Sequence, residues 1–507
     1  MHRLLSVAET READRRAVAG GRPGIDLMNA AGRAVADAVL ARIGGREHST
    51  VLVLCGPGNN GGDGFVCARL LAEQGIGVRV GLLGRSESVG GDAALALAAW
   101  RGPVEDARSC DPGDATIVVD ALFGSGLTRD LDGDAARVVS RINESKRPVV
   151  AVDVPSGLDA ETGAIRGVAV RANATVTFAR LKPGHLLLPG RGVCGQVICS
   201  DIGIDEAIID ELAPRTFANG PALWGDAFPE PALDAHKYTR GHALVLSGDA
   251  TRTGAARLTA RAALRVGAGA VTLASPRAAL AVNAAHLTAI MLVPCDGAPD
   301  LVALLSDERL NAVGLGPALG RGVMTRDLVS VAATTQRALM LDADALTSFE
   351  DDARGLAGIV AGTPTVITPH AGEFRRLFSR EADVLGAPSR LAQARAGAVL
   401  LGAVVVLKGA DSVIAAPDGR AAINATGTPY LATAGSGDVL GGRVTGLMAQ
   451  GVPAFEAACA AVWLHGRAGE RAGPGLIAED LPEVIPAVLR DLLAARGAAS
   501  GHLEPRP

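Results

Sequence analysis

The chain has 507 residues, which is more than one hydrophobic core usually supports, so at least two domains are expected. Apolar residues make up 48% and charged residues 20%, a balance typical of a globular rather than a disordered protein. The formal net charge of −5 and the lack of any Lys/Arg-rich run exclude a basic field for nucleic acid or for an anionic membrane.

The cysteines and the N-terminus indicate the compartment. Seven cysteines are scattered without a CxxC pair, which predicts reduced thiols and neither a zinc nor a redox site. The N-terminus is charged within its first sixteen residues, and no later run reaches the roughly 18 apolar residues of a membrane span. We therefore expect a cytoplasmic protein without a nucleic-acid or membrane partner. We also expect a homo-oligomer, whose size the sequence does not give.

The first part of the chain has the pattern of a doubly wound sheet. Helical apolar spacing runs from a capping box at Ser6 and Glu9 to about Ala41, with a break at residues 20–24. Short β-branched runs then alternate with Ala- and Leu-rich stretches; the runs are 51–55, 78–83, 116–120, 148–154 and 174–179. Such alternation predicts a parallel sheet covered on both faces. We predict a Rossmann-like, three-layer αβα domain over residues 1–213.

Ligands of such sheets bind beyond the carboxyl ends of the strands, so the segments that follow the runs are the candidates. They are the Gly-rich segment 56–65, the segment 123–130, and Asp153 with the residues after it. Glycines permit close approach of the backbone to a phosphate, and the convergence of three strand ends predicts a ligand site. Each loop taken alone could equally be a structural turn.

The same loops carry oxygen atoms that suit a hard cation. Asn60, Asp120 and Ser156 follow three different strands and offer amide, carboxylate and hydroxyl oxygens. These residue types agree with a cation site but leave potassium and magnesium both open.

The boundary between the domains is marked by prolines. Between about residues 205 and 237 the apolar rhythm fades, and Pro214, Pro221, Pro229 and Pro231 occur within eighteen residues. We predict a linker over 214–232, a second domain over 233–490 and a tail over 491–507.

The second domain repeats the alternation of strands and helices. Its predicted strands are 242–248, 270–275, 289–294, 311–316, 338–346, 364–369, 403–409 and 412–416, and a helix is predicted over 255–266. This is enough for a second, larger three-layer αβα sheet.

The segment Thr433 to Gly442, TAGSGDVLGG, is the strongest chemical signal of the second domain. Its small residues let backbone N–H groups surround an anion, and Asp438 stands where the loop should open into a helix. A carboxylate beside such a nest suits phosphoryl transfer, because the amides bind phosphate oxygens while the carboxylate takes the proton of the attacking hydroxyl. The alternative is a Gly-rich turn in which Asp438 only caps the helix.

Other strand ends of this domain carry candidates with equally plain alternatives. His370 follows a predicted strand, where binding side chains concentrate, although a lone histidine is more often structural. Lys408 could bind phosphate or be a solvated lysine. Asp342 and Asp344 could contact a ligand or cap the next turn.

Taken together, these motifs resemble a known family. CGPGNNGGDGF, DALFGSGL and AVDVPSGLDAETG resemble the epimerase domain, and GLGPALG, TPHAGEF, KGADS and AGSGDVLGG the dehydratase domain, of the bifunctional NAD(P)H-hydrate repair enzymes. The motifs stand in family order from about Leu4 to about Val488. The resemblance implies that the first domain interconverts the R and S forms of NADHX and NADPHX with a bound potassium ion. It implies that the second, ribokinase-like domain dehydrates the S form to NAD(P)H with ADP, or ATP, and Mg²⁺.

The resemblance also implies the site residues. The epimerase contacts fall on Asn59, Asn60, Gly61, Gly62, Asp63, Gly124, Ser125, Gly126, Leu127, Thr128, Arg129, Asp130 and Asp153, and potassium on Asn60, Asp120 and Ser156. In the dehydratase the hydrate contacts fall on Ala255, Gly316, His370 and Asp438, and the nucleotide contacts on Lys408, Gly409, Ala410, Asp411, Ser412, Gly435 and Gly437. Asp438 is the predicted base for phosphorylation of the hydrate hydroxyl, and Asp153 is the candidate base for epimerisation.

A different function remains open from the residues alone. The second domain could be a small-molecule kinase of ribokinase type, fused to a Rossmann-like module that binds without catalysis. A stable phosphorylated product would favour the kinase.

Overall fold

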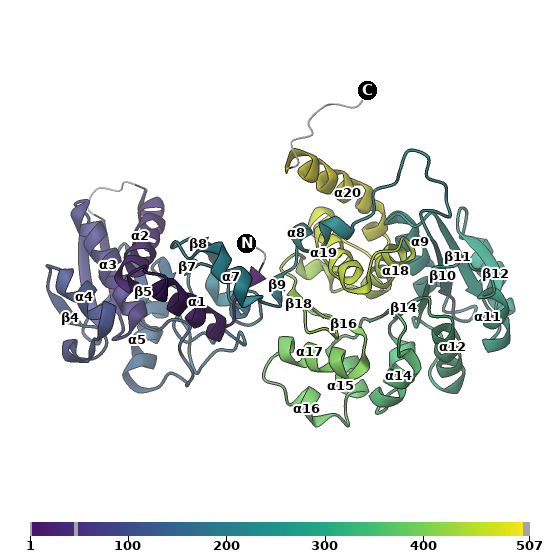
Figure 1. Cartoon of the computed structure of the whole chain (residues 1–507), viewed down its shortest axis with the longest axis horizontal. Coiled ribbons are helices and arrows are strands. Elements are labelled where there is room, and N and C mark those ends of the chain that lie inside the picture. Colours follow the sequence, from purple (N-terminus) through teal and green to yellow (C-terminus); the bar gives the residue numbers. More distant parts are fainter. Residues whose placement is uncertain (1–2, 45–48, 500–507) are drawn as a thin grey trace. The chain divides into compact units, whose positions relative to one another are not determined.

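The computed structural model describes residues 3–44 and 49–499. The chain forms two compact units, Arg3–Thr216 and the part from Phe217 onward, each built of a mainly parallel sheet between layers of helices (Figure 1). The predicted fold class is confirmed. None of the helices in the described part of the chain is long and apolar enough to cross a membrane.

The first unit follows the predicted order of elements. Its elements are β1 (Arg3–Leu4), α1 (Val7–Ala19), α2 (Gly24–Ile43), β2 (Thr50–Cys55), α3 (Asn59–Glu73), β3 (Gly77–Leu82), α4 (Gly91–Ala99), β4 (Val104–Asp106), β5 (Ile117–Ala121), α5 (Gly133–Glu144), β6 (Val149–Val152), β7 (Ala174–Phe178), α6 (Arg191–Cys194), β8 (Gln196–Ser200) and α7 (Glu206–Leu212). The capping box at Ser6 and Glu9 is present, and α1 ends at the predicted break.

The sheet of the first unit is parallel throughout, in the order β4-β3-β2-β5-β6-β7-β8. Because side chains alternate along a strand, Val51 and Val53 of β2 pack against α2 and α3, whereas Leu52 and Leu54 pack towards α5. All four are fully buried, so both faces of the sheet are covered. The strand order reverses between β2 and β5, which is where such sheets open a ligand crevice.

The second unit is larger. Its elements are β9 (Thr216–Ala218), α8 (Pro221–Trp224), β10 (His242–Leu246), α9 (Gly254–Arg265), β11 (Ala270–Ser275), α10 (Leu280–Ala284), β12 (Met291–Pro294), α11 (Ala298–Leu304), β13 (Ala312–Leu315), α12 (Val323–Thr334), β14 (Ala338–Leu341), α13 (Asp344–Thr347), α14 (Ala353–Val360), β15 (Thr365–Ile367), α15 (Ala371–Leu377), α16 (Ala382–Leu385), α17 (Arg390–Leu401), β16 (Val404–Leu407), β17 (Val413–Ala415), β18 (Ala421–Ile423), α18 (Ser436–Ala449), α19 (Ala454–Ala472) and α20 (Asp480–Ala499).

Its strands run in the order β9-β18-β17-β16-β15-β14-β13-β10-β11-β12. The pairs from β12 to β16 are parallel, while β17 is antiparallel to both β16 and β18. Helices α9, α18, α19 and α20 pack on one face, and α12, α14 and α17 lie on the other (Figure 1). The order reverses between β10 and β13, so a second crevice is expected there.

The strands β4, β8 and β18 are among those that were not predicted. β4 and β18 have only three residues each, and β8 is half-buried and carries Gln and Cys within it. Each is too short or too polar to give a periodic signal. The structure adds them beside strands that the sequence did predict.

The predicted linker 214–232 is corrected. The segment contains β9 and α8, and Trp224 is only 1% exposed. Its indole packs against Phe228 and Trp463 and donates to Asn219 Oδ1 at 3.2 Å. The prolines and the weak apolar periodicity suggested a linker, but the segment is folded and held in place by the Trp224 side chain. The predicted tail is corrected in part as well, because α20 extends to Ala499 and Leu492 is buried in the core; residues 500–507 lie outside the described residues.

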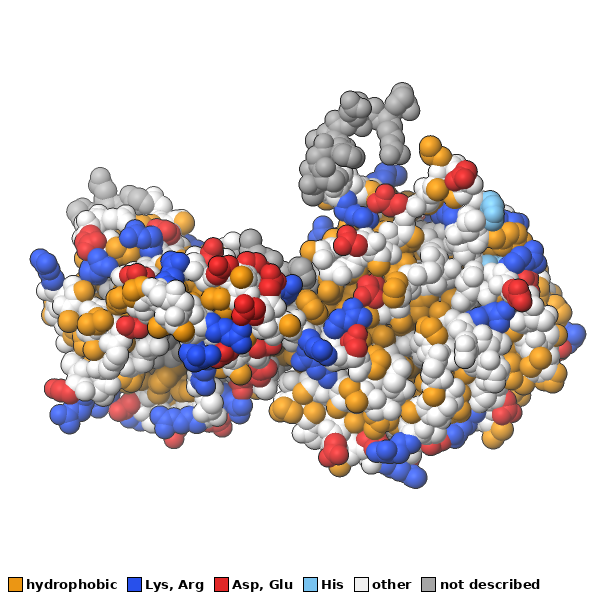
Figure 2. All heavy atoms as spheres, viewed as in Figure 1, with side chains coloured by type: hydrophobic (Ala, Val, Ile, Leu, Met, Phe, Trp, Pro, Cys, Tyr) orange, Lys and Arg blue, Asp and Glu red, His pale blue; other side chains and the backbone are white. Residues whose placement is uncertain are grey.

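The described surface carries both signs of charge. On the face in Figure 2, acidic and basic side chains are interspersed over both units. The mixed surface agrees with the small net charge.

The position of Trp224 makes a prediction about where the second unit can be cut. A protein that starts at residue 233 lacks β9 and Trp224, so it should melt at a lower temperature than one that starts at residue 215. In the full chain Trp224→Ala should lower the unfolding free energy of this unit by about 3–5 kcal/mol, since a large buried aromatic is lost. Thermal unfolding of the proteins measures both effects. Equal melting temperatures for the two truncated proteins would show that the segment is peripheral.

Candidate active sites

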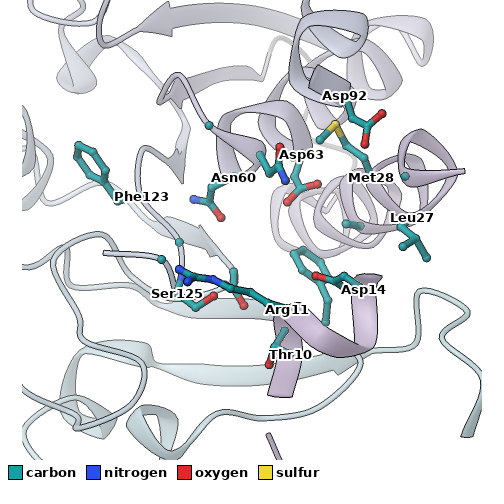
Figure 3. Close-up of a pocket in the computed structure, with 18 of the residues that line it drawn as sticks. Thr10, Arg11, Asp14, Leu27, Met28, Asn60, Asp63, Asp92, Phe123 and Ser125 are labelled. Carbon is teal, nitrogen blue, oxygen red and sulfur yellow. The ribbon is translucent and has the colours of Figure 1, made fainter. Parts of the chain in front are cut away.

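A cavity of about 770 Å³ lies at the carboxyl ends of β2, β5, β6 and β7 of the first unit, and α1 and α2 also line it (Figure 3). It brings together most of the residues predicted for this unit: Asn59, Asn60, Asp63, Gly124, Ser125, Gly126, Leu127, Thr128, Arg129 and Asp153. Gly61, Gly62 and Asp130 are not among the residues that line it. Three segments that are distant in sequence therefore form one site.

Gly61 and Gly62 are needed for packing. A β-carbon on Gly61 would lie 1.9 Å from the carbonyl oxygen of Gly56, and one on Gly62 would lie 2.6 Å from the Met28 side chain. Only glycine permits these approaches at the first turn of α3. The two residues thus hold the Gly-rich loop and α3 in place, while Asn60 and Asp63 project into the cavity (Figure 3).

Asp153 stands at the floor of the cavity with every polar atom engaged. Its carboxylate accepts hydrogen bonds from Lys182 Nζ at 2.8 Å, Thr177 Oγ1 at 3.0 Å and the Ser125 amide at 2.9 Å. Its carbonyl oxygen lies 2.9 Å from His185 Nε2. The backbone is left-handed, with φ 63°, which turns the chain out of β6. This conformation is tolerated better by Asp than by most residues.

Lys182 is 1% exposed and fixes the charge state of Asp153. Burial alone would raise the pKa of this carboxyl, but the ammonium group and the hydrogen bonds from Lys182 and Ser125 outweigh it and hold the pKa far below its usual value. Asp153 is therefore a fixed negative charge. A carboxylate of such low pKa is a weak proton acceptor.

Asp14 and Asp63 face the same cavity with the opposite shift. Burial, against the lowering effect of Lys182 and with a smaller contribution from the charge of Asp153, raises the pKa of Asp14 to about 6. Burial, Asp153 and Asp14 raise the pKa of Asp63 well above its usual value. Figure 3 shows Asp63 projecting from α3 and Asp14 from α1 on the other side of the cavity. Both carboxyl groups therefore hold a proton more readily than an ordinary aspartate does.

The sequence patterns did not indicate Lys182 or Asp14 as site residues. Lys182 follows the run 174–179 directly, so the rule used for the other strand ends would have found it. Asp14 lies on α1 among other charged residues, and nothing in the sequence distinguishes it.

The predicted cation ligands are only partly brought together. Asp120 and Ser156 are fully buried, and the carboxylate accepts from the Ser156 hydroxyl at 2.6 Å and the Ser156 amide at 2.8 Å. Burial raises the pKa of Asp120 to about 6, and none of the ion pairs among the described residues involves it. Asn60 is connected to them only through the loop Phe123–Gly124, where the Phe123 amide donates to Ser156 Oγ at 2.8 Å.

The second unit places an ion pair at its own strand ends. Asp342 follows β14 and Lys408 follows β16, and Lys408 Nζ lies 2.9 Å from Asp342 Oδ1. Glu373 is 3.9 Å from the same ammonium group. Although burial opposes it, the negative charges of Asp342, Glu373 and Asp438 raise the pKa of Lys408, so it stays protonated. Lys408 is thus not a solvated lysine, and Asp342 holds it.

Asp438 lies in the first turn of α18, as predicted. Gly435 precedes the helix in a left-handed conformation with φ 86°, and Gly437 stands beside Lys408, since a β-carbon there would lie 3.5 Å from Nζ. Burial, Asp342 and Glu373 raise the pKa of Asp438 to about 6, against the lowering effect of Lys408. The side chain of Asp438 accepts no capping hydrogen bond, so the cap interpretation is not supported by geometry.

Thr259 connects two of the predicted contacts. Its hydroxyl lies 3.0 Å from the carbonyl oxygens of both Ala255 and Asp438, and α9 packs closely on α18. A β-carbon on Gly442 would lie 2.2 Å from the Thr259 carbonyl oxygen, so glycine is required for this approach. The first turns of the two helices are therefore held side by side.

His370 caps α15. Its Nδ1 accepts from the amides of Gly372 at 2.9 Å and Glu373 at 3.3 Å, and Glu373 Oε2 accepts from the His370 amide at 2.8 Å. The structural alternative is thus correct for Nδ1. Because Nδ1 is an acceptor, the ring proton lies on Nε2, which is 3.6 Å from Glu373 Oε1 in a half-exposed side chain.

The loop 408–412 is a tight turn. Ser412 Oγ accepts from the Gly409 amide at 3.0 Å, and Asp411 is 4% exposed with its carboxylate 3.2 Å from Arg390 Nε. The Asp411 side chain therefore braces the turn, while Gly409 and Ala410 are exposed. Gly316, after β13, has φ 136°, and a β-carbon on it would lie 1.8 Å from the Asp342 carbonyl oxygen.

Each of the two units matches a known protein family. Residues 243–485 match the family model described as NAD(P)H-hydrate dehydratase, and residues 24–184 match the model described as YjeF-related protein N-terminus. The chain is 37% identical to the bifunctional NAD(P)H-hydrate repair enzyme Nnr of Salinibacter ruber, with 96% of each chain covered. It is 38% identical to the protein of that name from Moorella thermoacetica, over 96% of this chain and 97% of the relative. The chain belongs to the family of bifunctional NAD(P)H-hydrate repair enzymes. The resemblance seen in the motifs is confirmed.

A solved structure resembles about half of the chain. The ADP/ATP-dependent NAD(P)H-hydrate dehydratase of Bacillus subtilis, co-crystallised with ATP/Mg²⁺, is 28% identical and covers 54% of this chain and 98% of its own, with a TM-score of 0.48.

Proposed function

We propose that this protein repairs hydrated nicotinamide nucleotides. The first unit interconverts the R and S forms of NADHX and NADPHX, and the second dehydrates the S form to NAD(P)H at the expense of ADP. The observation that carries the proposal is the placement of Asp438, a carboxylate of raised pKa, in the first turn of α18 beside Lys408. Relatives of almost equal length bear the name of these repair enzymes.

The dehydratase chemistry follows from these groups. The hydrate hydroxyl is a poor leaving group, so it is first phosphorylated: Asp438 takes its proton while the oxygen attacks the terminal phosphorus of the nucleotide. The amides of Gly435 to Gly437 bind the phosphate oxygens, and Lys408 lies beside them. The C6–O bond then breaks with loss of phosphate and of a C5 proton, which restores the dihydronicotinamide. Expulsion of phosphate explains why a nucleotide is consumed.

Magnesium is proposed to accompany the nucleotide. Among the described residues no group of three or more His, Cys, Asp or Glu side chains is arranged to hold a metal ion. The donors that suit Mg²⁺ here are therefore the nucleotide phosphates with few protein ligands. The cytoplasmic location and the homo-oligomeric state stay predictions.

In the first unit we assign different tasks to the carboxyl groups than the sequence suggested. A protonated Asp63 gives its proton to the C6 hydroxyl, which leaves as water while the ring nitrogen forms a C=N⁺ bond. Asp153, held ionised by Lys182, stabilises the cation. Water then adds to the opposite face of the ring and returns its proton to Asp63. Asp153 thus acts through its charge and Asp63 through its proton.

Potassium is proposed at Asp120 and Ser156, with Asn60 beside them. The fit rests on two observations: the donor set is all oxygen, and Asp120 is buried without a cationic partner in the described chain. A bound K⁺ would supply the charge that compensates Asp120. Ser156 itself fixes the loop Phe123–Gly124, which lines the cavity, because its Oγ accepts from the Phe123 amide.

The first test of the function is the pH profile of the dehydratase and its loss in Asp438→Asn. The base must be ionised, so kcat/KM should fall as the pH drops below about 6, where Asp438 becomes protonated. Asn keeps the shape but not the proton acceptor, and a loss of at least ~10²-fold is expected. The assay follows the return of NAD(P)H absorbance from the S hydrate with ADP, and epimerase turnover serves as the control. A stable phosphorylated product in the wild type would instead identify a kinase.

The roles in the first unit predict different variants. Asp63→Asn removes the proton donor and should slow epimerisation by about 10²-fold. Asp92→Asn, which changes another carboxylate of the same cavity, is the matched control and should have little effect. Epimerisation is measured by chromatography of the two hydrate forms without nucleotide. If Asp63→Asn retained full activity while Asp92→Asn lost it, the proton donor would be misassigned.

The proposed potassium site predicts that KCl affects the first unit and that substitution of Asp120 removes this effect. Epimerase activity and the melting temperature of the first unit should rise with KCl at constant ionic strength set by choline chloride, because K⁺ binds the folded site. Asp120→Asn should remove the response of both. The dehydratase of the same protein should be unchanged. A wild type that responds equally to KCl and choline chloride would contradict the assignment.

A further inference from the structure

The core of the second unit contains an arginine without a counter-ion. Arg443 lies in α18 and is 0% exposed. Its Nη1 lies 2.6 Å from His465 Nδ1 and its Nη2 2.7 Å from the Leu481 carbonyl oxygen, while Nε has no partner. None of the carboxylates among residues 3–44 and 49–499 forms an ion pair with it. Burial lowers the pKa of Arg443 to about 9, so it is still charged at neutral pH.

Such a charge is expensive to bury, and an apolar side chain of the same length would pack without that cost. Its neighbours are therefore informative. His465 lies on α19, and its Nε2 is 2.9 Å from the hydroxyl of Ser436. Ser436 is the first residue of α18 and directly follows Gly435. The arginine thus reaches, through one histidine, the turn that carries Asp438.

The direction of these hydrogen bonds follows from their chemistry. A guanidinium group can only donate, so Nδ1 of His465 must accept. Burial and the charges of Arg443 and Lys408 hold the pKa of His465 well below its usual value, which keeps the ring neutral. The single ring proton is then on Nε2, and Ser436 Oγ accepts it. The hydroxyl proton of Ser436 is left free for another acceptor.

We propose that Arg443, His465 and Ser436 form a directed hydrogen-bond chain that positions the first turn of α18 for the terminal phosphate of the nucleotide. They are positioning residues, and the assignment rests on the proposed function, which puts that phosphate at Gly435–Gly437. On a helix that rises ~1.5 Å per residue, Arg443 is only about 10 Å from Ser436 along the axis. In a buried helix its charge is weakly screened and adds to the positive potential at the N-terminus.

The hydrogen bonds of Arg443, His465 and Ser436 also connect α18 to α19 and α20. The test must therefore separate an effect on phosphate binding from an effect on helix packing. Ser436→Ala removes the last link with the smallest change. Thr445→Val removes another fully buried hydroxyl of α18, which donates only within its own helix, to the Gly441 carbonyl oxygen at 2.8 Å. Thr445→Val is therefore the matched control for the loss of a buried hydroxyl.

The experiment measures the dissociation constants of ADP and AMP for the full chain by calorimetry. Ser436→Ala should weaken ADP about fivefold to tenfold, the size of one lost hydrogen bond, and leave AMP unchanged, because AMP lacks the phosphate that the turn binds. Thr445→Val should leave both constants unchanged. Equal losses for ADP and AMP in Ser436→Ala, or ADP affinity equal to that of the wild type, would overturn the proposal.

A second measurement does not depend on any ligand. In ¹⁵N-histidine-labelled protein, the resonance identified by its absence in His465→Gln should report a neutral ring protonated on Nε2. In Arg443→Met this fixed tautomer should be lost. A His465 ring protonated on Nδ1 in the wild type would contradict the proposed direction of the hydrogen bonds. If the wild type bound no ADP, the proposed function would be wrong. The tautomer of His465 would still show whether the hydrogen-bond chain exists.

Discussion

Both units depend on the same constraint: a parallel sheet that is buried on both faces can hold charge only at the ends of its strands. Each unit places one buried Asp–Lys pair there, Asp153 with Lys182 and Asp342 with Lys408, both with N–O distances below 3 Å. Desolvation of such a pair is costly, and it is offset here by hydrogen bonds from Ser125 and Thr177 in one site and from the Ala343 amide in the other. The pair therefore gives each crevice a defined charge before any ligand binds.

The pairs also explain why neighbouring carboxyl groups behave differently from one another. In each site one carboxylate forms an ion pair with the lysine. The neighbouring carboxyl groups are buried and lie close to the negative charge of that carboxylate. Asp14 and Asp63 beside Asp153, and Asp438 beside Asp342, consequently have raised pKa values. A fixed anion next to a group that titrates near neutral pH is the combination that proton-transfer chemistry requires.

Much of this could be predicted from the sequence, because the loops after the strands are local. The segments 56–65 and 123–130 were recognisable from strand patterns followed by glycines and polar residues, and the structure brings them to the predicted strand ends. Asp438 was recognisable from the Gly-rich segment that opens a helix, and it lies in the first turn of α18. What joins them is not local. The partner of Asp153 lies 29 residues away, and that of Asp342 66 residues away, so no periodicity reveals either pair. Trp224 likewise shows its role only when Phe228 and Trp463 surround it.

The backbone has an unusual conformation next to each of the two Asp–Lys ion pairs. Asp153 has φ 63°, and Ala343, directly after Asp342, has φ 47°. A left-handed residue costs a non-glycine roughly 1–2 kcal/mol, so neither would persist without compensation. In both places the turn breaks the alternation of the strand, which would otherwise send successive side chains to opposite faces of the sheet. At each place the carboxylate meets the lysine that follows another strand: β7 lies next to β6, whereas β15 lies between β14 and β16. An ion pair and a left-handed residue therefore occur together at both strand ends.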